Sequence, residues 1–191
     1  MRSGGDFESL LWYNNPMFSD PENNIRQLSL VDGMHVADFG SGSGFYSLAI
    51  AKAVAPTGRV FAVDIQKDLL QKLKNGAKQS HLNNVDIIWG DLEHLGGTKL
   101  RENSMDAVVV ANLFFQIQNK DGLCLEIKRV LKPKARVLVV DWSASFGGIG
   151  PQENDVVPKI NMTTLFHDHG FTLDREIAAG AEHYGLVFRK N

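Results

Sequence analysis

Runs of consecutive apolar residues alternate with amphipathic stretches along most of the chain. The apolar runs are rich in Val, Ile and Ala and lie at 34–39, 59–64, 85–89, 105–111 and 135–140. Stretches with apolar residues at helical spacing lie at 45–54, 67–80 and 122–131. Strands that are apolar on both faces and separated by helices are typical of a parallel sheet covered by helices on both sides. The pattern therefore predicts an α/β fold.

The rhythm changes after residue 158. A helical pattern at 159–169 is followed by two apolar runs, at 171–177 and 183–189. Only residues 178–182 separate these two runs, a link that allows a hairpin but is too short for a parallel crossover. We therefore expect the sheet to end in an antiparallel pair.

Two segments fall outside this alternation. The N-terminal segment, 1–30, holds several aromatic residues before a helix that begins near Pro21, and we expect it to serve as a lid. Residues 143–158 form a long Gly-containing loop, and long loops at strand ends often bind ligands. No repeat marks a second domain, so residues 1–191 are predicted to form one domain with its core at 31–191.

Charge and composition exclude several kinds of site. The formal net charge of −2 gives no basic footprint for nucleic acid. There is no run of 18 apolar residues and no apolar signal-peptide core, so we expect no membrane span and a cytoplasmic location. Cys124 is the single cysteine, which excludes an internal disulfide and a cysteine-based zinc site. No metal site is predicted.

The first apolar run ends in an acid and leads into alternating glycines. Asp38 is followed by Gly40, Gly42 and Gly44, and a helical pattern begins directly after them. Glycine lets a backbone turn tightly and approach a ligand closely, and the start of a helix offers unpaired N–H groups. This arrangement predicts the site of a nucleotide-like cofactor.

A dinucleotide is the first cofactor to consider. Its fingerprint is G-x-G-x-x-G/A, with an acid about 20 residues further on. Asp64 fits that distance, but the third small residue falls on Phe45. Asp38 would also place a negative charge near a pyrophosphate, whereas it suits a cationic cofactor. Because the distance to Asp64 does fit, an NAD(P)-dependent oxidoreductase is kept as an alternative hypothesis.

Five motifs follow one another along the chain at 36–44 (VADFGSGSG), 61–64 (FAVD), 88–92 (IWGDL), 105–112 (MDAVVVAN) and 126–133 (EIKRVLKP). In these motifs the chain resembles class I S-adenosylmethionine-dependent methyltransferases, in the branch near the ubiquinone/menaquinone C-methyltransferases. The run at 183–190 resembles the last strand of that branch. The resemblance implies a three-layer αβα sandwich around a Rossmann-like, seven-stranded, mostly parallel sheet. The implied strand order is 3-2-1-4-5-7-6, with the last strand antiparallel.

The same resemblance implies roles in cofactor binding. The glycine loop would pack against the methionine part, and Asp64 would accept hydrogen bonds from both ribose hydroxyls. Ile65 would cover the adenine, and Asp91 would accept a hydrogen bond from its amino group. The full set of cofactor-binding residues implied in this way is Asp38, Gly40, Ser41, Gly42, Gly44, Phe45, Asp64, Ile65, Gly90, Asp91, Leu92 and Asn112.

The implied reaction is methyl transfer to a small-molecule acceptor, which leaves S-adenosylhomocysteine. Because the donor is already activated, the protein mainly aligns the reactants and excludes water, and no catalytic residue is identified. A non-catalytic protein that binds S-adenosylmethionine is a second alternative. An aromatic or apolar acceptor is expected above the fourth and fifth strands. The candidates for its pocket are Phe114, Phe115, Gln116, Asp141, Trp142 and Ser143, with Trp12, Tyr13 and Phe18 as a lid.

Overall fold

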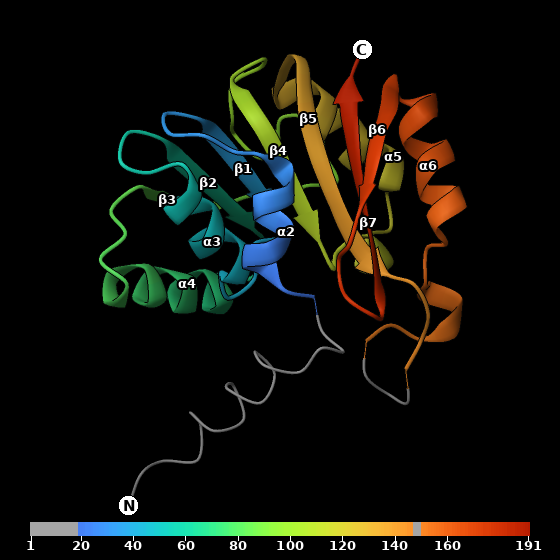
Figure 1. Ribbon diagram of the computed structural model, residues 1–191, viewed down its shortest axis with the longest axis horizontal. Helices are drawn as coiled ribbons and strands as arrows, with labels where there is room; N and C mark the ends of the chain where they lie inside the picture. Colours follow the sequence, from blue (N-terminus) through green and yellow to red (C-terminus); the bar gives the residue numbers. More distant parts are fainter. Residues whose placement is uncertain (1–18, 147–149) are drawn as a thin grey trace, which may run out of the picture.

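The computed structural model describes residues 19–146 and 150–191. These residues form a seven-stranded sheet with the order β3-β2-β1-β4-β5-β7-β6 (Figure 1). Strand β7 pairs antiparallel with both β5 and β6, while the pairs from β3 across to β5 are parallel. The strand order and the antiparallel last strand expected from the sequence are both confirmed.

The boundaries of most elements agree with the hydrophobic pattern. The strands are β1 (His35–Phe39), β2 (Arg59–Asp64), β3 (Val85–Trp89), β4 (Met105–Ala111), β5 (Leu131–Trp142), β6 (Phe171–Ile177) and β7 (His183–Lys190). The α-helices are α2 (Pro21–Leu28), α3 (Phe45–Ala53), α4 (Lys67–Gln79), α5 (Lys120–Val130) and α6 (Lys159–Asp168). Two short 3-10 helices, η1 (Phe114–Gln116) and η2 (Glu153–Asp155), lie in the connections.

Two elements, α5 and β5, differ from the prediction by two residues or more at a boundary. Helix α5 begins two residues early, because the Asn119 side chain accepts a hydrogen bond from the Gly122 N–H and caps the helix. Strand β5 begins at Leu131, where the sequence predicted only the stretch from Ala135. Its pairing with β4 shifts between Met105 and Ala107, so the residues around Pro133 bulge out of the ladder. Proline has no N–H to give to a ladder, which explains the bulge.

Helices cover both faces of the sheet. Helices α2 and α3 lie on one face, and α5 and α6 lie on the other (Figure 1). Successive residues of β1 face opposite sides: Val36 packs in the core beneath α2 and α3, and Ala37 and Phe39 pack in the core beneath α5 and α6. Helix α4 packs against β2 and β3. This is the three-layer sandwich that the resemblance implied.

Helix α2 begins where the sequence predicted it. Asp20 accepts a hydrogen bond from the Asn23 N–H at 3.0 Å, and Pro21 occupies the first turn. The predicted lid residues Trp12, Tyr13 and Phe18 lie outside the described residues. None of the helices found in 19–146 and 150–191 has the length and apolar character needed to cross a bilayer.

The core beneath α6 generates a first prediction. Phe166 is fully buried and stacks on Phe188 with ring centroids 4.4 Å apart and an interplanar angle of 6°. Phe166→Ala should lower the free energy of unfolding by about 3–5 kcal/mol, because it removes a large buried side chain and leaves a cavity. Ile160→Ala is the matched control, since Ile160 lies on the same helix and is 70% exposed. Denaturant unfolding measures both variants, and equal midpoints would contradict the packing described here.

Candidate functional site

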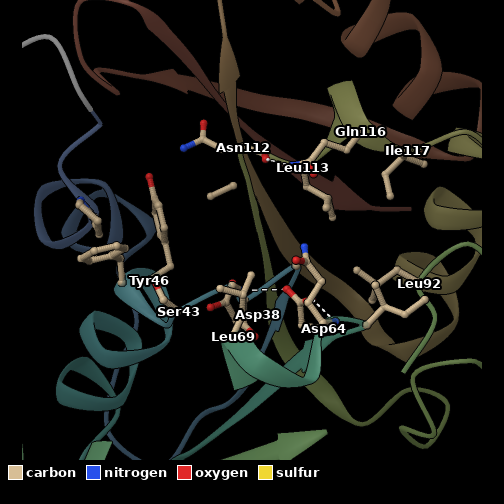
Figure 2. Close-up of a pocket in the computed structure, with 18 of the residues that line it drawn as sticks. Asp38, Ser43, Tyr46, Asp64, Leu69, Leu92, Asn112, Leu113, Gln116 and Ile117 are labelled. Atoms are coloured by element: carbon tan, nitrogen blue, oxygen red, sulfur yellow. Dashed lines mark hydrogen bonds between the residues drawn. The ribbon is translucent and has the colours of Figure 1, made fainter. Parts of the chain in front are cut away.

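A cavity of about 600 Å³ opens at the carboxyl ends of the parallel strands. Open parallel sheets bind their ligands at this edge. Figure 2 shows Tyr46 on one side of the cavity, Leu92 and Ile117 on the other, and Asp38 and Asp64 between them. All of the residues that the sequence placed in the cofactor site line this cavity, with the exception of Gly44.

Gly44 has a packing role. It precedes α3 with a φ of 104°, and a Cβ added there would lie 2.6 Å from Cγ of Leu73 on α4. A glycine is therefore needed so that α4 can approach the loop. Phe45, which stands where the dinucleotide fingerprint requires a small residue, is 53% exposed and lines the cavity.

The glycine loop is tied to the end of β2. The N–H groups of Gly40 and Ser41 both donate to the Val63 carbonyl, at 2.9 and 3.1 Å. The N–H of Gly42 donates to Oδ2 of Asp64 at 2.8 Å. Gly42 has a left-handed φ of 53°, and a Cβ added there would meet no atom within 4 Å. At Gly42 the backbone is therefore open to close approach by a ligand.

The carboxylate of Asp64 is held at both of its oxygens. Oδ2 accepts the hydrogen bond from Gly42, and Oδ1 accepts one from the Gln66 N–H at 2.8 Å. Each carboxylate oxygen has a second lone pair, so both can still accept a hydrogen bond from a ligand. The side chain lines the cavity and is only 7% exposed. It presents two fixed acceptors, which suits a pair of neighbouring hydroxyl groups.

Asp38 is a buried acid beside a second acid. Its side chain is 1% exposed, and Oδ2 accepts a hydrogen bond from Oγ of Ser47 at 2.5 Å. Burial, opposed by the Ser47 hydrogen bond and aided by the charge of Asp64, raises the pKa of Asp38 to about 7. A cation bound in the cavity would stabilise the ionised form of this carboxyl group.

Four buried polar atoms in the lining have no hydrogen-bond partner within the described chain. They are Oγ of Ser41, Oδ1 of Asn112 and the two ring nitrogens of His183. The backbone of Asn112 is fixed by a hydrogen bond from its N–H to the Val140 carbonyl at 2.8 Å. Leaving a buried polar group unpaired costs about 1–3 kcal/mol, so such atoms call for an explanation. A ligand with hydrogen-bonding groups provides one.

The end of β3 supplies the next part of the wall. Oδ1 of Asp91 accepts a hydrogen bond from the Glu93 N–H at 2.9 Å, and Oδ2 lies 2.9 Å from Nδ1 of His94. Ile65 is 59% exposed in the lining, and its carbonyl accepts a hydrogen bond from Nε1 of Trp89. This part of the cavity therefore combines apolar side chains with a carboxylate.

The residues predicted for the acceptor pocket are only partly correct. Gln116 and Trp142 line the cavity, whereas Phe114, Phe115, Asp141 and Ser143 do not. Phe114 turns into the core and packs edge-to-face on Phe166. Asp141 is 2% exposed and accepts hydrogen bonds from the N–H groups of Phe114 and Trp142. Asp141 therefore supports the turn after β4, and burial raises its pKa to about 6.

Several lining residues were missed by sequence reasoning, among them Ser19, Tyr46, Leu69, Leu113 and Ile117. Tyr46 and Leu69 were assigned only to helices, but both lie in the first turn after a strand-end loop. Leu113 and Ile117 flank η1, directly beyond β4. Their position after strand ends is the signal that would have identified them, because that edge of the sheet forms the site.

Helix α2 meets the cavity through a three-residue hydrogen-bond network. Nδ2 of Asn24 donates to Oγ of Ser19 at 2.7 Å and to the Tyr46 hydroxyl at 2.8 Å, and the two hydroxyl oxygens are 2.5 Å apart. The three contacts use both amide protons and one hydroxyl proton. Burial raises the pKa of Tyr46 to about 12, so its hydroxyl is protonated. Among the described residues, one O–H donor at the wall formed by Ser19 and Tyr46 therefore has no acceptor.

Comparison with known proteins agrees with this geometry. A family model described as a methyltransferase domain matches residues 30–176. The chain is 25% identical over 122 residues to a demethylmenaquinone methyltransferase from Geobacillus sp. (strain WCH70), covering 64% of this chain and 51% of that protein. It is 31% identical over 119 residues to the ubiquinone/menaquinone biosynthesis C-methyltransferase UbiE of Burkholderia vietnamiensis (strain G4 / LMG 22486), covering 62% and 47%. The chain thus spans about half the length of the curated relatives it matches.

A solved structure extends the agreement over the whole fold. The crystal structure of a SAM-dependent methyltransferase from Aquifex aeolicus has a TM-score of 0.85 at 24% identity and covers 100% of both chains. Fold, site and family model together define the class of protein. The chain belongs to the methyltransferase-domain family, within the class I methyltransferases that use S-adenosylmethionine.

Asp38 generates a prediction about pH. S-adenosylmethionine carries a sulfonium and an amino group, so it should bind the ionised form of Asp38 more tightly. That form is the minor one below pH 7 and becomes the major one above it. The affinity for S-adenosylmethionine should therefore rise about fivefold between pH 6 and 7, in proportion to the ionised fraction of Asp38. This interval lies below the pH range in which the amino group of the cofactor loses its proton. Calorimetric titration of the wild type and of Asp38→Asn measures this, and an identical rise in the variant would contradict the assignment.

Proposed function

We propose that this protein transfers a methyl group from S-adenosylmethionine to a small-molecule acceptor. The observation that carries the proposal is the convergence of three acids on one cavity. Asp38, Asp64 and Asp91 stand at or just beyond the ends of β1, β2 and β3, and all three line the cavity. A cationic cofactor with a ribose and an adenine has a group to match each of them.

The residues present fit such a cofactor. The two fixed oxygens of Asp64 would accept hydrogen bonds from the ribose hydroxyls, and Asp91 would accept one from the adenine amino group. Oδ1 of Asn112 would receive a hydrogen bond from the amino group of the methionine part, which would remove an unpaired buried acceptor. When bound, the cofactor supplies a methyl group on a positively charged sulfur, which needs no further activation. The protein's part is alignment and exclusion of water.

The size and walls of the cavity favour a small acceptor. A volume of about 600 Å³ is in the range of small-molecule sites. The wall beyond β4 and at the end of β5 carries the apolar side chains of Leu113, Ile117 and Trp142. The names of the relatives refer to menaquinone and ubiquinone biosynthesis, which supports a small ring compound.

Two features of the glycine loop disfavour the oxidoreductase hypothesis. Its fingerprint requires a small residue at position 45, where the chain has a Phe that faces the cavity. Its pyrophosphate would also lie beside Asp38, which is buried below the same loop. Non-catalytic binding of S-adenosylmethionine is the alternative that experiment has to separate from methyl transfer.

The ribose assignment leads to a prediction for Asp64→Ala. Losing two hydrogen bonds to a charged group, each worth about 1.5–3 kcal/mol, should weaken S-adenosylhomocysteine binding by about 100-fold or more. Asp68→Ala is the control, because it removes an exposed acid from the first turn of α4. Calorimetry measures affinity, and circular dichroism checks the fold. Unchanged affinity in Asp64→Ala would refute the assignment.

Catalysis is tested with S-adenosylmethionine labelled in its methyl group. The protein is incubated with the labelled cofactor and a metabolite extract, and the small-molecule fraction is analysed for label. We expect label in one or a few compounds, and none in a matched incubation with Asp64→Ala. If the wild type binds the cofactor tightly but labels no compound, methyl transfer is contradicted and the non-catalytic alternative is favoured.

A further inference from the structure

His183 occupies the end of the cavity that lies furthest from the three acids along the sheet. It is the first residue of β7 and stands opposite Trp142 at the end of β5. The two rings are 4.3 Å apart between centroids and both line the cavity. The acids belong to the ends of β1, β2 and β3, so β4 lies between their strands and the His183–Trp142 pair.

Both ring nitrogens of His183 lack a partner. The side chain is 7% exposed, and neither Nδ1 nor Nε2 has a hydrogen bond within the described chain. Burial lowers the pKa of His183 to about 4, so the ring is neutral at neutral pH. A neutral imidazole has one N–H donor and one lone-pair acceptor. A buried group of this kind is unfavourable until a ligand pairs with it.

The charges of the lining restrict what that ligand can be. The charged side chains around the cavity are all acidic: Asp20, Asp38, Asp64, Asp91 and Glu93. The lining described for this cavity includes no Lys or Arg, so an anionic acceptor would be repelled without compensation. None of these five acids lies on β5 or β7, the strands that carry Trp142 and His183, so the lining residues of these two strands offer no carboxylate to an ammonium group. The end near His183 therefore favours an uncharged group.

We propose that His183 and Trp142 form the acceptor subsite and bind the hydroxyl group of a neutral, flat ring compound. A hydroxyl can both donate and accept, so it pairs with either nitrogen of a neutral imidazole, whereas a ketone pairs with only one of them. The indole of Trp142 and the side chains of Leu113 and Ile117 supply an aromatic and apolar wall for the ring. This inference rests on the proposed function and adds the chemical class of the acceptor.

The test uses the protein saturated with S-adenosylhomocysteine and three probes of one ring system. The probes are 2-naphthol, 2-methylnaphthalene and 2-naphthoate, which differ only in carrying a hydroxyl, a methyl or a carboxylate group. We expect 2-naphthol to bind about tenfold more tightly than 2-methylnaphthalene, the size of one neutral hydrogen bond, and 2-naphthoate to bind more weakly than either. Equal binding of 2-naphthol and 2-methylnaphthalene, or tighter binding of 2-naphthoate, would overturn the inference.

Variants of His183 separate hydrogen bonding from packing. His183→Phe keeps a ring against Trp142 but removes both nitrogens, so the preference for 2-naphthol should disappear. His183→Asn keeps a donor group and an acceptor group and should retain most of the preference. His167→Ala is the control, because the His167 side chain is 81% exposed on α6. A preference for 2-naphthol that survives in His183→Phe would overturn the assignment.

A spectroscopic readout completes the test. The histidine rings are labelled with nitrogen-15 and followed by NMR, and the signals of His183 are identified by their absence from the spectrum of His183→Phe. Addition of 2-naphthol should shift these signals and leave those of the other histidines unchanged. Binding of S-adenosylhomocysteine is measured first in every variant and shows that each is folded. Failure of that binding in the wild type would contradict the proposed function together with this inference. Intact cofactor binding without a His183 shift would contradict this inference alone.

Discussion

The hydrogen bonds between the glycine loop and the end of β2 are the constraint on which the site depends. Gly40 and Ser41 share the Val63 carbonyl, and the Gly42 N–H fixes one oxygen of Asp64. These bonds join the loop of one strand to the acid of its neighbour. The positions of both are therefore set together, and a cofactor that contacts the loop also meets the Asp64 carboxylate at a defined distance. Gly44 allows this arrangement because it leaves room for Leu73.

Charge divides the cavity into two parts. The acids at β1, β2 and β3 form a negative end, and burial of Asp38 beside Asp64 makes that end unfavourable until a cation arrives. The end at β5 and β7 presents an uncharged histidine and a tryptophan. A cationic methyl donor and a neutral acceptor would thus be sorted to opposite ends by electrostatics, which is consistent with the function we propose.

The sequence predicted the fold well because the fold depends on local pattern. The Val- and Ile-rich runs located β2, β3 and β4 to the residue, and the ordered motifs implied the strand order. The site was harder to predict. The packing role of Gly44 depends on Leu73, which is distant in the chain. Phe114 and Asp141 turn away from the cavity because of one hydrogen bond that crosses from β5 to η1, and no local pattern reveals such a contact.

The central claim is that the glycine loop and its acids recognise S-adenosylmethionine and not a dinucleotide. Calorimetric titration of the wild-type protein with S-adenosylhomocysteine and, separately, with NAD⁺ tests it most directly. The account predicts saturable binding of one S-adenosylhomocysteine per chain and no heat of binding with NAD⁺. Saturable binding of NAD⁺ without a response to S-adenosylhomocysteine would contradict it.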